Sequence, residues 1–258
     1  MSGAPHDAAT PGDRAPLGRP RRHLRRTDST NERARALAAG GAPHGTVVTA
    51  GEQTAGRGRQ GRVWTAPPNS SLLCSVVIRD PPRLLPLAAG AAVAEAVDAA
   101  AGAAAAEAVD AAPRPARRAC IKWPNDILVA GLKVAGILVE GRPQEHWAVV
   151  GIGVNLAVRE RDFPPELAGR AGTLGLSPDQ IEPTLETLLA SLERWLVADP
   201  EDLLAEVRAR DALRGRPVRW AGGEGRGDGI DGDGRLVVLT PARGRVTLDA
   251  GEVHLVRE

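Results

Sequence analysis

The sequence is poor in aromatic residues and in cysteine. Its 258 residues include five Trp, one Phe and no Tyr. So few rings leave little material for the stacking surfaces on which proteins hold single-stranded nucleic acid. The two cysteines, Cys74 and Cys120, lie far apart and lack CxxC spacing, so neither a disulfide framework nor a zinc knuckle is expected.

The chain also lacks a strong net charge, since 33 basic residues face 32 acidic ones. This balance argues against a protein that holds nucleic acid mainly through a basic surface. The N-terminus has no apolar core of a signal peptide, and no apolar run is expected to reach the length of a membrane span. We therefore expect a soluble, cytoplasmic protein.

Three regions are predicted along the chain. Residues 1–24 are rich in Pro, Gly, Ala and Arg without apolar periodicity, which predicts a disordered tail. Residues 25–212 mix helical and strand patterns without a strand–helix–strand rhythm, and this mixture predicts an α+β domain. From residue 213, short strand patterns with Asp-Gly turns predict a small β-barrel over 213–258.

Helical patterns cover three segments of the middle region. Thr30–Ala39 follows a possible N-cap, and 183–212 carries leucines at helical spacing. Residues 84–112 are alanine-rich and predict a helix or a pair of helices. Within them "AEAVDAA" occurs twice, at 94–100 and 106–112, which indicates a local duplication to which we assign no function.

The segment "TAGRGRQGRVW", residues 54–64, fits the G-x-G-x-x-G spacing of a dinucleotide-binding turn. That turn needs a helix after the glycines, whose N-terminus meets the pyrophosphate. Pro67 and Pro68 follow here, and the next apolar run has the pattern of a strand. The segment is therefore not of the dinucleotide-binding type.

An anion-binding loop is the other functional interpretation of this segment. Glycines let the backbone approach a ligand, while Arg57 and Arg59 bring planar donors that stay charged. A solvated Gly/Arg surface loop explains the same residues, and the loop alone does not separate the two.

Three further segments carry polar groups at the ends of predicted elements. "KWPND" (122–126) is followed by Lys133 before an apolar run, with a predicted hairpin about Ala130–Gly131. "DSTN" (28–31) stands at a helix start, and "GIGVNL" (151–156) places an asparagine at a strand end. The simpler interpretations are a surface lysine, an N-cap and a turn asparagine, respectively.

Taken in order, "STN", "QTAGRGRQGRVW", "KWPND", "KVAGILVE", "GIGVNL" and a C-terminal "GIDGDGRLVV…GEVHLV" resemble the biotin protein ligase family over about residues 28–258. The resemblance implies a catalytic domain with the fold of class II tRNA synthetases and lipoate ligases, followed by an SH3-like barrel. It implies a ligase that forms biotinyl-5′-AMP from biotin and Mg²⁺-ATP and passes biotin to a lysine of a biotin carboxyl carrier protein of acetyl-CoA or acyl-CoA carboxylase.

The same resemblance implies roles for individual residues. Ser29, Thr30 and Asn31 would form the biotin pocket. Gln53 and the loop would close over the biotin carboxylate and the phosphate, and the loop residues concerned are Gly56, Arg57, Gly58 and Arg59.

A second set of residues would act on the nucleotide. Lys133 would bind the carboxylate and α-phosphate oxygens, and Arg59 would be the more important arginine for holding the adenylate. Asn125 and Asp126 would shape the nucleotide side, with Asp126 positioning the metal or the incoming lysine. Asn155 would contact adenine. Lys133, Arg59 and Asp126 are thus the predicted catalytic residues, and no metal ligands are assigned.

Two other functions are weighed against this one. A lipoate or octanoate ligase has the same fold, but "KWPND" together with "GRGRQG" favours biotin. A nucleic-acid-binding protein using the Arg loop and tail is disfavoured by the charge balance and the few aromatics. We expect a ligase-only protein without an N-terminal DNA-binding domain, a monomer or homodimer that binds neither DNA nor membranes.

Overall fold

The computed structural model describes residues 16–107 and 118–256, which contain two sheets and a short ribbon. The larger sheet contains β1 (Arg21–Leu24), β2 (Val47–Ala50), β5 (Ser71–Arg79), β6 (Cys120–Lys122), β7 (Asp126–Val129), β8 (Leu132–Arg142) and β9 (Trp147–Asn155). The ribbon is β3 (Gly56–Arg57) with β4 (Val63–Trp64). The C-terminal sheet contains β10 (Pro217–Trp220), β11 (Gly223–Ile230), β12 (Leu236–Thr240), β13 (Gly244–Leu248) and β14 (His254–Leu255). The helices are α1 (Thr30–Ala39), α2 (Leu85–Glu107), α3 (Ile181–Val197) and α4 (Pro200–Ala209).

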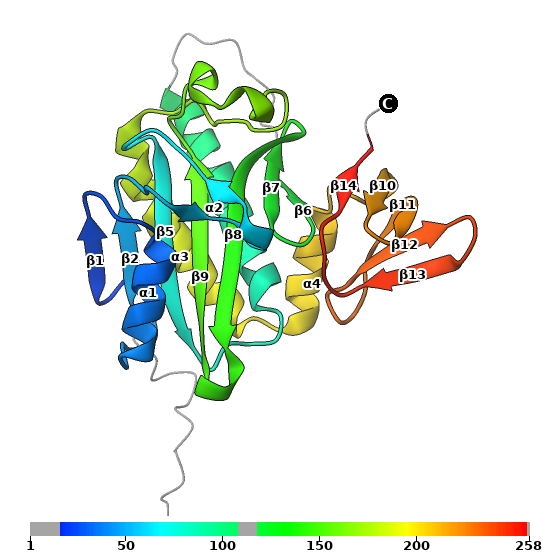
Figure 1. Cartoon of the computed structure of the whole chain (residues 1–258), viewed down its shortest axis with the longest axis horizontal. Coiled ribbons are helices and arrows are strands. Elements are labelled where there is room, and N and C mark those ends of the chain that lie inside the picture. The colour runs from blue at the N-terminus through cyan, green and yellow to red at the C-terminus, as the bar shows by residue number, and fades with distance from the viewer. Residues whose placement is uncertain (1–15, 108–117, 257–258) are drawn as a thin grey trace, which may run out of the picture.

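The larger sheet is mixed, with strand order β1-β2-β5-β9-β8-β7-β6. The pair β1–β2 is parallel, and the neighbouring pairs from β2 to β6 are antiparallel. Figure 1 shows this sheet in the middle of the molecule and the C-terminal sheet beside α4. A mixed sheet with helices agrees with the predicted α+β class.

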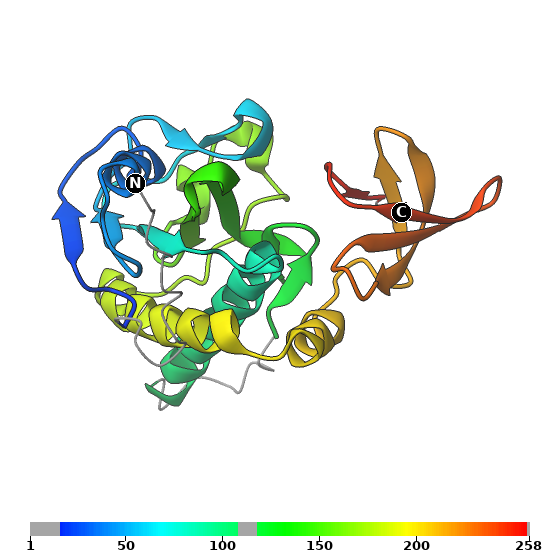
Figure 2. The ribbon, with the colours of Figure 1, turned by 90° about the horizontal axis from the view of Figure 1, so that it is seen from below.

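The two faces of the larger sheet are covered differently, because residues of a strand alternate between faces. In β9, the even-numbered residues of 148–154 join the large apolar core that includes α2 and α3. Trp147 and Val149 instead pack in a smaller cluster with Ala34 and Ala38 of α1. Figure 2 shows α2 and α3 along one face of the sheet and α1 on the other.

Helix α2 is apolar on most of its surface. Its segment Leu85–Ala103 has a mean hydropathy of 1.3 and is long enough to cross a membrane, which corrects the expectation that no apolar run reaches that length. In the structure 67% of this segment is buried, in contact with α3, α4 and strands β6 to β8. Its composition is therefore that of a core helix. Residues 108–112, which complete the repeated "AEAVDAA", lie outside the described residues.

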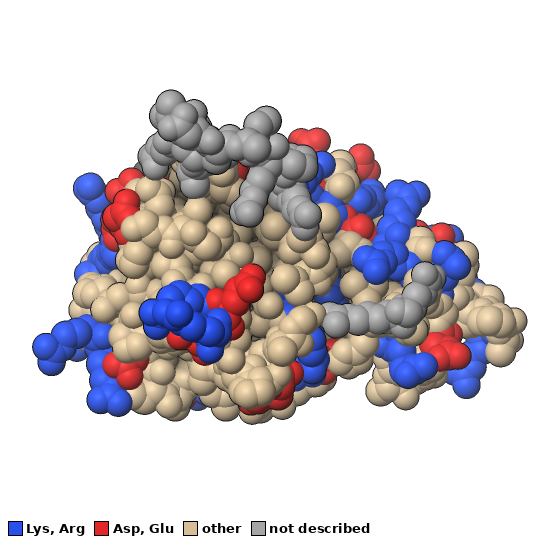
Figure 3. Space-filling view, turned by 90° about the horizontal axis from the view of Figure 1, so that it is seen from above, with Lys and Arg blue, Asp and Glu red and all other residues tan. Residues whose placement is uncertain are grey.

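The C-terminal sheet contacts the main body through α4 and a turn. The Trp123 indole N–H donates to the carbonyl of Gly234 at 3.1 Å, and Arg208 of α4 donates to the carbonyl of Ile230 at 2.8 Å. Asp231 shapes the turn by accepting backbone N–H groups, as the Asp-Gly pattern predicts. Figure 3 shows basic and acidic side chains interspersed over one face of the molecule rather than gathered by sign.

The predicted disordered tail is wrong for residues 16–24, while residues 1–15 lie outside the described part. Leu17 is buried, and β1 pairs with β2 over four residues. An edge strand is held by backbone hydrogen bonds, so its side chains can be mostly polar, and here Arg21, Arg22 and His23 are exposed while Leu24 is partly buried. One of them, Arg21, pairs with Glu182 of α3. The lack of an apolar pattern concealed this strand.

The helical segment predicted over 183–212 is two helices, α3 and α4. Asp199 caps α4 by accepting the backbone N–H of Glu201 at 2.8 Å. Pro200 follows at the first helical position, where its missing N–H costs nothing. The hairpin predicted about Ala130–Gly131 is confirmed, because both residues adopt positive φ between the paired Val129 and Leu132.

Candidate functional site

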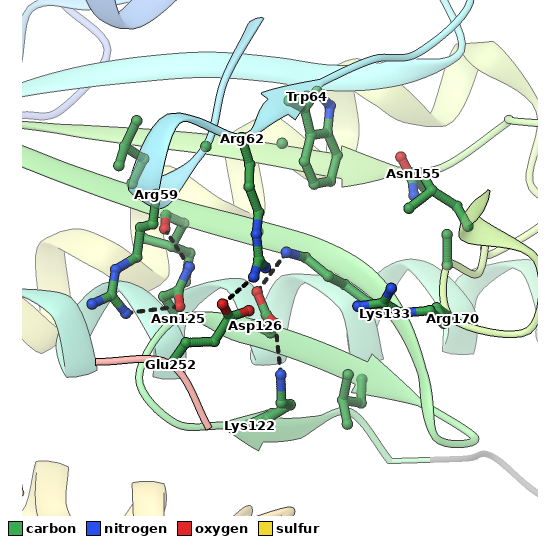
Figure 4. Close-up of a pocket in the computed structure, with 18 of the residues that line it drawn as sticks. Arg59, Arg62, Trp64, Lys122, Asn125, Asp126, Lys133, Asn155, Arg170 and Glu252 are labelled. Atoms are coloured by element: carbon green, nitrogen blue, oxygen red, sulfur yellow. Dashed lines mark hydrogen bonds and ion pairs between the residues drawn. The ribbon is translucent and has the colours of Figure 1, made fainter. Parts of the chain in front are cut away.

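A cavity of about 870 Å³ lies on the α1 face of the larger sheet. Its lining comes from segments far apart in the chain: the start of α1, the β7–β8 hairpin, the end of β9, and residues 252–255, which include β14 of the C-terminal sheet. Residues 53–65, which we call the Gly/Arg loop, cover one side. The volume is that of a site for a small organic ligand. Figure 4 shows the polar side chains of this cavity.

Glycines of β9 make room for the cavity. Trp147 and Val149 fill this face under α1, but the next residues on it are Gly151 and Gly153. A Cβ at Gly153 would lie 2.6 Å from the Trp64 indole, and a Cβ at Gly151 would lie 2.0 Å from the Asn31 side chain. The "GIGVN" pattern therefore places two side chains close against the backbone of β9.

Trp64 forms a wall of the cavity above these glycines. Its indole N–H is buried and has no hydrogen-bond partner among the described residues. Its ring lies 5.8 Å from the Lys133 ammonium, within the range of a cation–π interaction. Trp64 thus packs between the Gly/Arg loop, of which it is part, and the backbone of β9.

A carboxylate with two lysines stands at the floor of the cavity. Asp126 Oδ1 lies 2.5 Å from Lys133 Nζ, and Asp126 Oδ2 lies 3.2 Å from Lys122 Nζ. Burial acts to raise the pKa of Asp126, but the two ammonium groups outweigh it and hold the pKa below its ordinary value. Asp126 is thus a carboxylate that fixes both lysines and stays ionised.

A bulge in β8 turns Lys133 into the cavity. Ile127 pairs with Ala135 and Leu128 pairs with Lys133, which leaves Val134 as an extra residue in β8. Beyond the bulge, Gly136 faces the cavity, and a Cβ there would lie 3.2 Å from Lys133 Cε. Such bulges redirect side chains and are frequent beside active sites.

The three arginines of the Gly/Arg loop have different partners. Arg57 pairs with Glu32 at 3.2 Å and with Glu140 at 3.0 Å. Arg62 pairs with Glu252. Burial acts to raise the pKa of the Glu252 carboxyl, but the pairing with Arg62 holds this pKa below its ordinary value. Arg59 lies in the 3-10 turn Arg59–Gly61, and its one partner among the described residues is the neutral amide of Asn125, to which it donates at 3.1 Å. Figure 4 shows Arg59 and Arg62 reaching these partners.

A row of polar groups runs along the start of α1. Gln53 Oε1 accepts from the Thr30 backbone N–H at 2.7 Å and lies 3.0 Å from its hydroxyl. The Ser75 hydroxyl lies 2.8 Å from Thr30 Oγ1 and 2.7 Å from Asn31 Oδ1. Asn31 Nδ2 then donates to Glu140 at 2.8 Å. The resulting pocket end offers both donors and acceptors.

The remaining predicted residues are placed as follows. Ser29 is buried at the N-cap position of α1, but its side chain makes no cap hydrogen bond, so the simple N-cap interpretation does not account for it. The Asn125 amide donates to the Ile137 carbonyl at 3.0 Å. The Asn155 amide donates to the Gly172 carbonyl at 3.0 Å and lies 3.4 Å from the Ser71 hydroxyl.

Of the predicted site residues, all but one line this cavity. Those in the lining are Ser29, Thr30, Asn31, Gln53, Arg57, Gly58, Arg59, Asn125, Asp126, Lys133 and Asn155. Gly56 is not in the lining; a Cβ there would lie 2.3 Å from the Trp64 carbonyl, so it allows β3 and β4 to approach. The surface-lysine interpretation of Lys133 is therefore wrong.

The sequence analysis missed five charged residues of the lining: Arg62, Lys122, Arg170, Arg216 and Glu252. Arg62 and Lys122 belong to motifs already singled out, and membership of these motifs could have predicted that they line the site. Glu252 lies in the C-terminal "GEVHLV" segment, to which no site role was assigned, and Arg170 and Arg216 lie in segments where no pattern marks a site. With Arg57, Arg59 and Lys133, seven cationic side chains line the cavity against two carboxylates, Asp126 and Glu252. This excess suits a ligand with several negative charges.

Fold and site together show a cavity in which cationic side chains stand next to a small polar pocket end, on a mixed sheet with the Gly/Arg loop over it. The chain belongs to the biotin/lipoate A/B protein ligase family, whose model matches residues 23–156. The predicted resemblance is thereby confirmed.

Individual relatives agree with this membership. The chain is 35% identical to the biotin–[acetyl-CoA-carboxylase] ligase of Mycobacterium tuberculosis, over 89% of this chain and 86% of that protein. It is 37% identical to the ligase of the same name from Paracoccus denitrificans, over 89% and 98%. Among solved structures, the biotin protein ligase from Aquifex aeolicus in complex with biotin and ATP matches with a TM-score of 0.72 and 26% identity, over 93% of this chain and 100% of that one.

Proposed function

We propose that this protein is a biotin ligase that activates biotin with ATP and transfers it to a lysine of a biotin carboxyl carrier protein. In the first step a carboxylate oxygen of biotin bonds to the α-phosphorus of ATP, and the bond to pyrophosphate breaks. In the second step the lysine amine attacks the acyl carbon of biotinyl-5′-AMP, and AMP leaves. Adenylation is needed because a free carboxylate does not acylate an amine at neutral pH.

One observation carries this proposal: the pocket end formed by Gln53, Thr30 and Asn31 shares a single cavity with the cationic cluster. A ureido ring needs both donors and acceptors, which these amide and hydroxyl groups supply. The cationic part suits a carboxylate and a triphosphate brought together, whose mutual repulsion the enzyme must offset. The polar pocket end favours biotin over lipoate or octanoate, whose distal ends are apolar.

Lys133 is the proposed electrophilic residue. Asp126 takes one of its donors and fixes its position, which leaves two donors for the biotin carboxylate and the α-phosphate. Arg59 would hold the adenylate, because its partner in the described part of the chain is a neutral amide that an anion can replace without separating an ion pair. Ser29, Thr30, Asn31 and Gln53 would bind biotin, and Asn155 would contact adenine through its free hydrogen-bonding capacity.

Mg²⁺ is proposed as part of the substrate Mg²⁺-ATP. The described residues contain no group of three or more His, Cys, Asp or Glu side chains that could hold a metal ion. Mg²⁺ is commonly bound by one or two carboxylates together with substrate phosphates, and Asp126 is the carboxylate on the cavity floor that fits this role.

Several finer features stand as proposals too. The larger unit, over about 25–212, would have the fold of class II tRNA synthetases, and the antiparallel C-terminal sheet, over about 213–258, would be an SH3-like barrel. Acetyl-CoA carboxylase, the acceptor in the names of the curated relatives, indicates the class of carrier protein. The absence of DNA and membrane binding, the cytoplasmic location and the monomeric or dimeric state remain predictions.

ATP–pyrophosphate exchange tests the proposal directly. We expect exchange that depends on biotin, with little exchange when lipoate or octanoate replaces it. Exchange with lipoate or octanoate but not with biotin would identify the alternative ligase. An absence of exchange with all three acids, together with salt-sensitive DNA binding, would contradict the enzyme function.

A further inference from the structure

The Glu140 carboxylate joins the proposed biotin pocket to the Gly/Arg loop. Its Oε2 accepts from the Asn31 side-chain amide at 2.8 Å, while its Oε1 lies 3.0 Å from the Arg57 guanidinium. The Glu140 side chain is 21% exposed; of its two partners Asn31 is buried, whereas the Arg57 side chain is 42% exposed. Glu140 is not part of the cavity lining, and it therefore acts through its two partners rather than on a ligand.

On the pocket side, Glu140 fixes which way the Asn31 amide faces. Donation from Nδ2 to Glu140 turns Oδ1 toward the Ser75 hydroxyl, 2.7 Å away. The amide lies so close to β9 that a Cβ at Gly151 would be 2.0 Å from Oδ1. Nδ2 also lies 3.4 Å from the Leu138 carbonyl, so Glu140 is the nearer of two acceptors that keep Nδ2 turned away from Ser75 and Oδ1 turned toward it.

On the loop side, Glu140 and Glu32 together hold Arg57. The guanidinium pairs with one carboxylate from β8 and one from α1, and Arg35 lies beside both of these acids. Planar guanidinium groups suit this double contact. Arg57 is thus paired with the body of the protein, in contrast to Arg59, whose partner is a neutral amide. Arg57 and Arg59, although two residues apart in the loop, therefore have different partners.

The contacts form a continuous path that begins and ends on the same loop. It runs from Gln53 through Thr30, Ser75 and Asn31 to Glu140, and from there to Arg57. Gln53 is the first residue of the Gly/Arg loop, and Arg57 follows four residues later. The groups that line the pocket end are therefore the same groups that anchor the base of the loop.

We propose that Glu140 is a positioning residue that orients Asn31 for biotin and anchors the Gly/Arg loop through Arg57. This inference rests on the proposed function for its biotin part alone, because the anchoring of the loop does not depend on any ligand. The two halves are separable by substitution: Glu140→Gln keeps an oxygen that can accept from Asn31 but removes the charge that pairs with Arg57, whereas Glu140→Ala removes both.

The test combines two measurements on the full chain. Initial rates of trypsin cleavage after Arg59 and Arg62 report the anchoring of the loop, and calorimetric titration with biotin alone reports the pocket. We expect Glu140→Gln to speed cleavage about fivefold with biotin affinity within about twofold of wild type. We expect Glu140→Ala to speed cleavage similarly and to weaken biotin binding about tenfold. Urea unfolding of each variant shows whether global stability explains the effect.

Two more variants complete the design. Arg57→Gln breaks the same contact from the loop side and also the pair with Glu32, so it should speed cleavage at least as much as Glu140→Gln. The double variant should add little further, because a shared contact gives non-additive effects. The control is Glu224→Gln, which removes a carboxylate paired with the exposed Arg219 on the C-terminal sheet and should change neither measurement.

The outcomes separate this inference from the proposed function. Unchanged cleavage in both Glu140→Gln and Arg57→Gln, or fully additive effects in the double variant, would overturn the anchoring role. Biotin binding by Glu140→Ala within twofold of wild type would overturn the orienting role. If wild type bound no biotin, the proposed function would fail and the orienting role with it, while the cleavage rates would still decide the anchoring role. If Glu140→Ala does not fold, the cleavage rate of Arg57→Gln still tests the anchoring role.

Discussion

The two faces of the larger sheet are built from the same strands for opposite purposes. On the α2 and α3 face, β9 and its neighbours present Ala, Val, Ile and Leu to a continuous core, and residues such as Leu188 are completely buried. On the α1 face, the same strands present Gly136, Gly151 and Gly153, with Asp126 beside them. Packing on this face ends where the cavity begins.

This difference shows how the fold keeps stability and function apart. A buried apolar side chain contributes through close packing, and its loss leaves a void. The cavity face lacks this packing and carries concentrated charge. The well-packed opposite face must therefore supply the stability that the cavity face does not. Substitutions on the two faces are therefore expected to have different effects, one on chemistry and the other on unfolding free energy.

The largest effect is expected for Lys133→Ala on the cavity face. Loss of the ammonium that would stabilise charge in the transition state should lower biotin-dependent ATP–pyrophosphate exchange by about 10²- to 10³-fold. The midpoint of urea unfolding should change little. Arg219→Ala, on the exposed surface of the C-terminal sheet, is the control for loss of a cation. Normal pyrophosphate release by Lys133→Ala would show that its assigned role is wrong.

Leu188→Ala should have the opposite profile. This α3 side chain is fully buried in the core, so we expect a loss of about 2 to 5 kcal/mol in the free energy of unfolding. The exchange rate per folded molecule should stay within about twofold of wild type at low temperature. Urea unfolding followed by circular dichroism measures the first quantity. A large fall in activity without destabilisation would break the separation of the two faces.

A smaller effect is expected for Arg59→Ala. Without this guanidinium the adenylate should be held less firmly, so biotinyl-AMP should appear free in solution about tenfold faster. Chromatography of filtrates from reactions without carrier protein measures the leak, and Arg57→Gln provides the comparison within the loop. Retention of the adenylate at the wild-type level would move the holding role from Arg59 to another cation of the lining.

The smallest effect concerns pH and Asp126. Its pKa is lower in the folded protein than in the unfolded chain, so the unfolded chain binds the proton more tightly. The stabilising contribution is therefore present above the ordinary carboxyl pKa of about 4 and is lost as the pH falls through the lower folded value. We expect Asp126→Asn to show a shallower decline of unfolding free energy below pH 4. Equal slopes for wild type and variant would contradict the shift.

The sequence predicted the site residues better than their arrangement. Thr30, Arg59, Asp126 and Lys133 were found because each stands in a short motif with polar groups at an element's end. That Lys133 shares a face with Gly136 depends on the extra Val134 in β8, which the alternation of residues does not reveal. A bulge depends on how two strands pair, and this pairing cannot be predicted from the sequence of either strand alone.

Contacts between distant segments were equally hidden. Glu252 reaches the cavity through its pair with Arg62, across most of the length of the chain. The strand β1 was missed because its partner, β2, supplies the hydrogen bonds while its own arginines face solvent. Both features follow from tertiary packing, which overrides local patterns.

The pair of lysines on Asp126 bears on whether biotinyl-AMP can acylate the protein that makes it. Lys122 and Lys133 are the only lysines in the chain, and its other 31 side-chain cations besides histidine are arginines. Both lysines are tied to one carboxylate. A mixed anhydride reacts with free amines, whereas guanidinium groups stay protonated and unreactive at neutral pH. Apart from its N-terminal amine, an enzyme of this composition offers released biotinyl-AMP almost nothing of itself to label, so the reactive acyl group is left for the lysine of its partner.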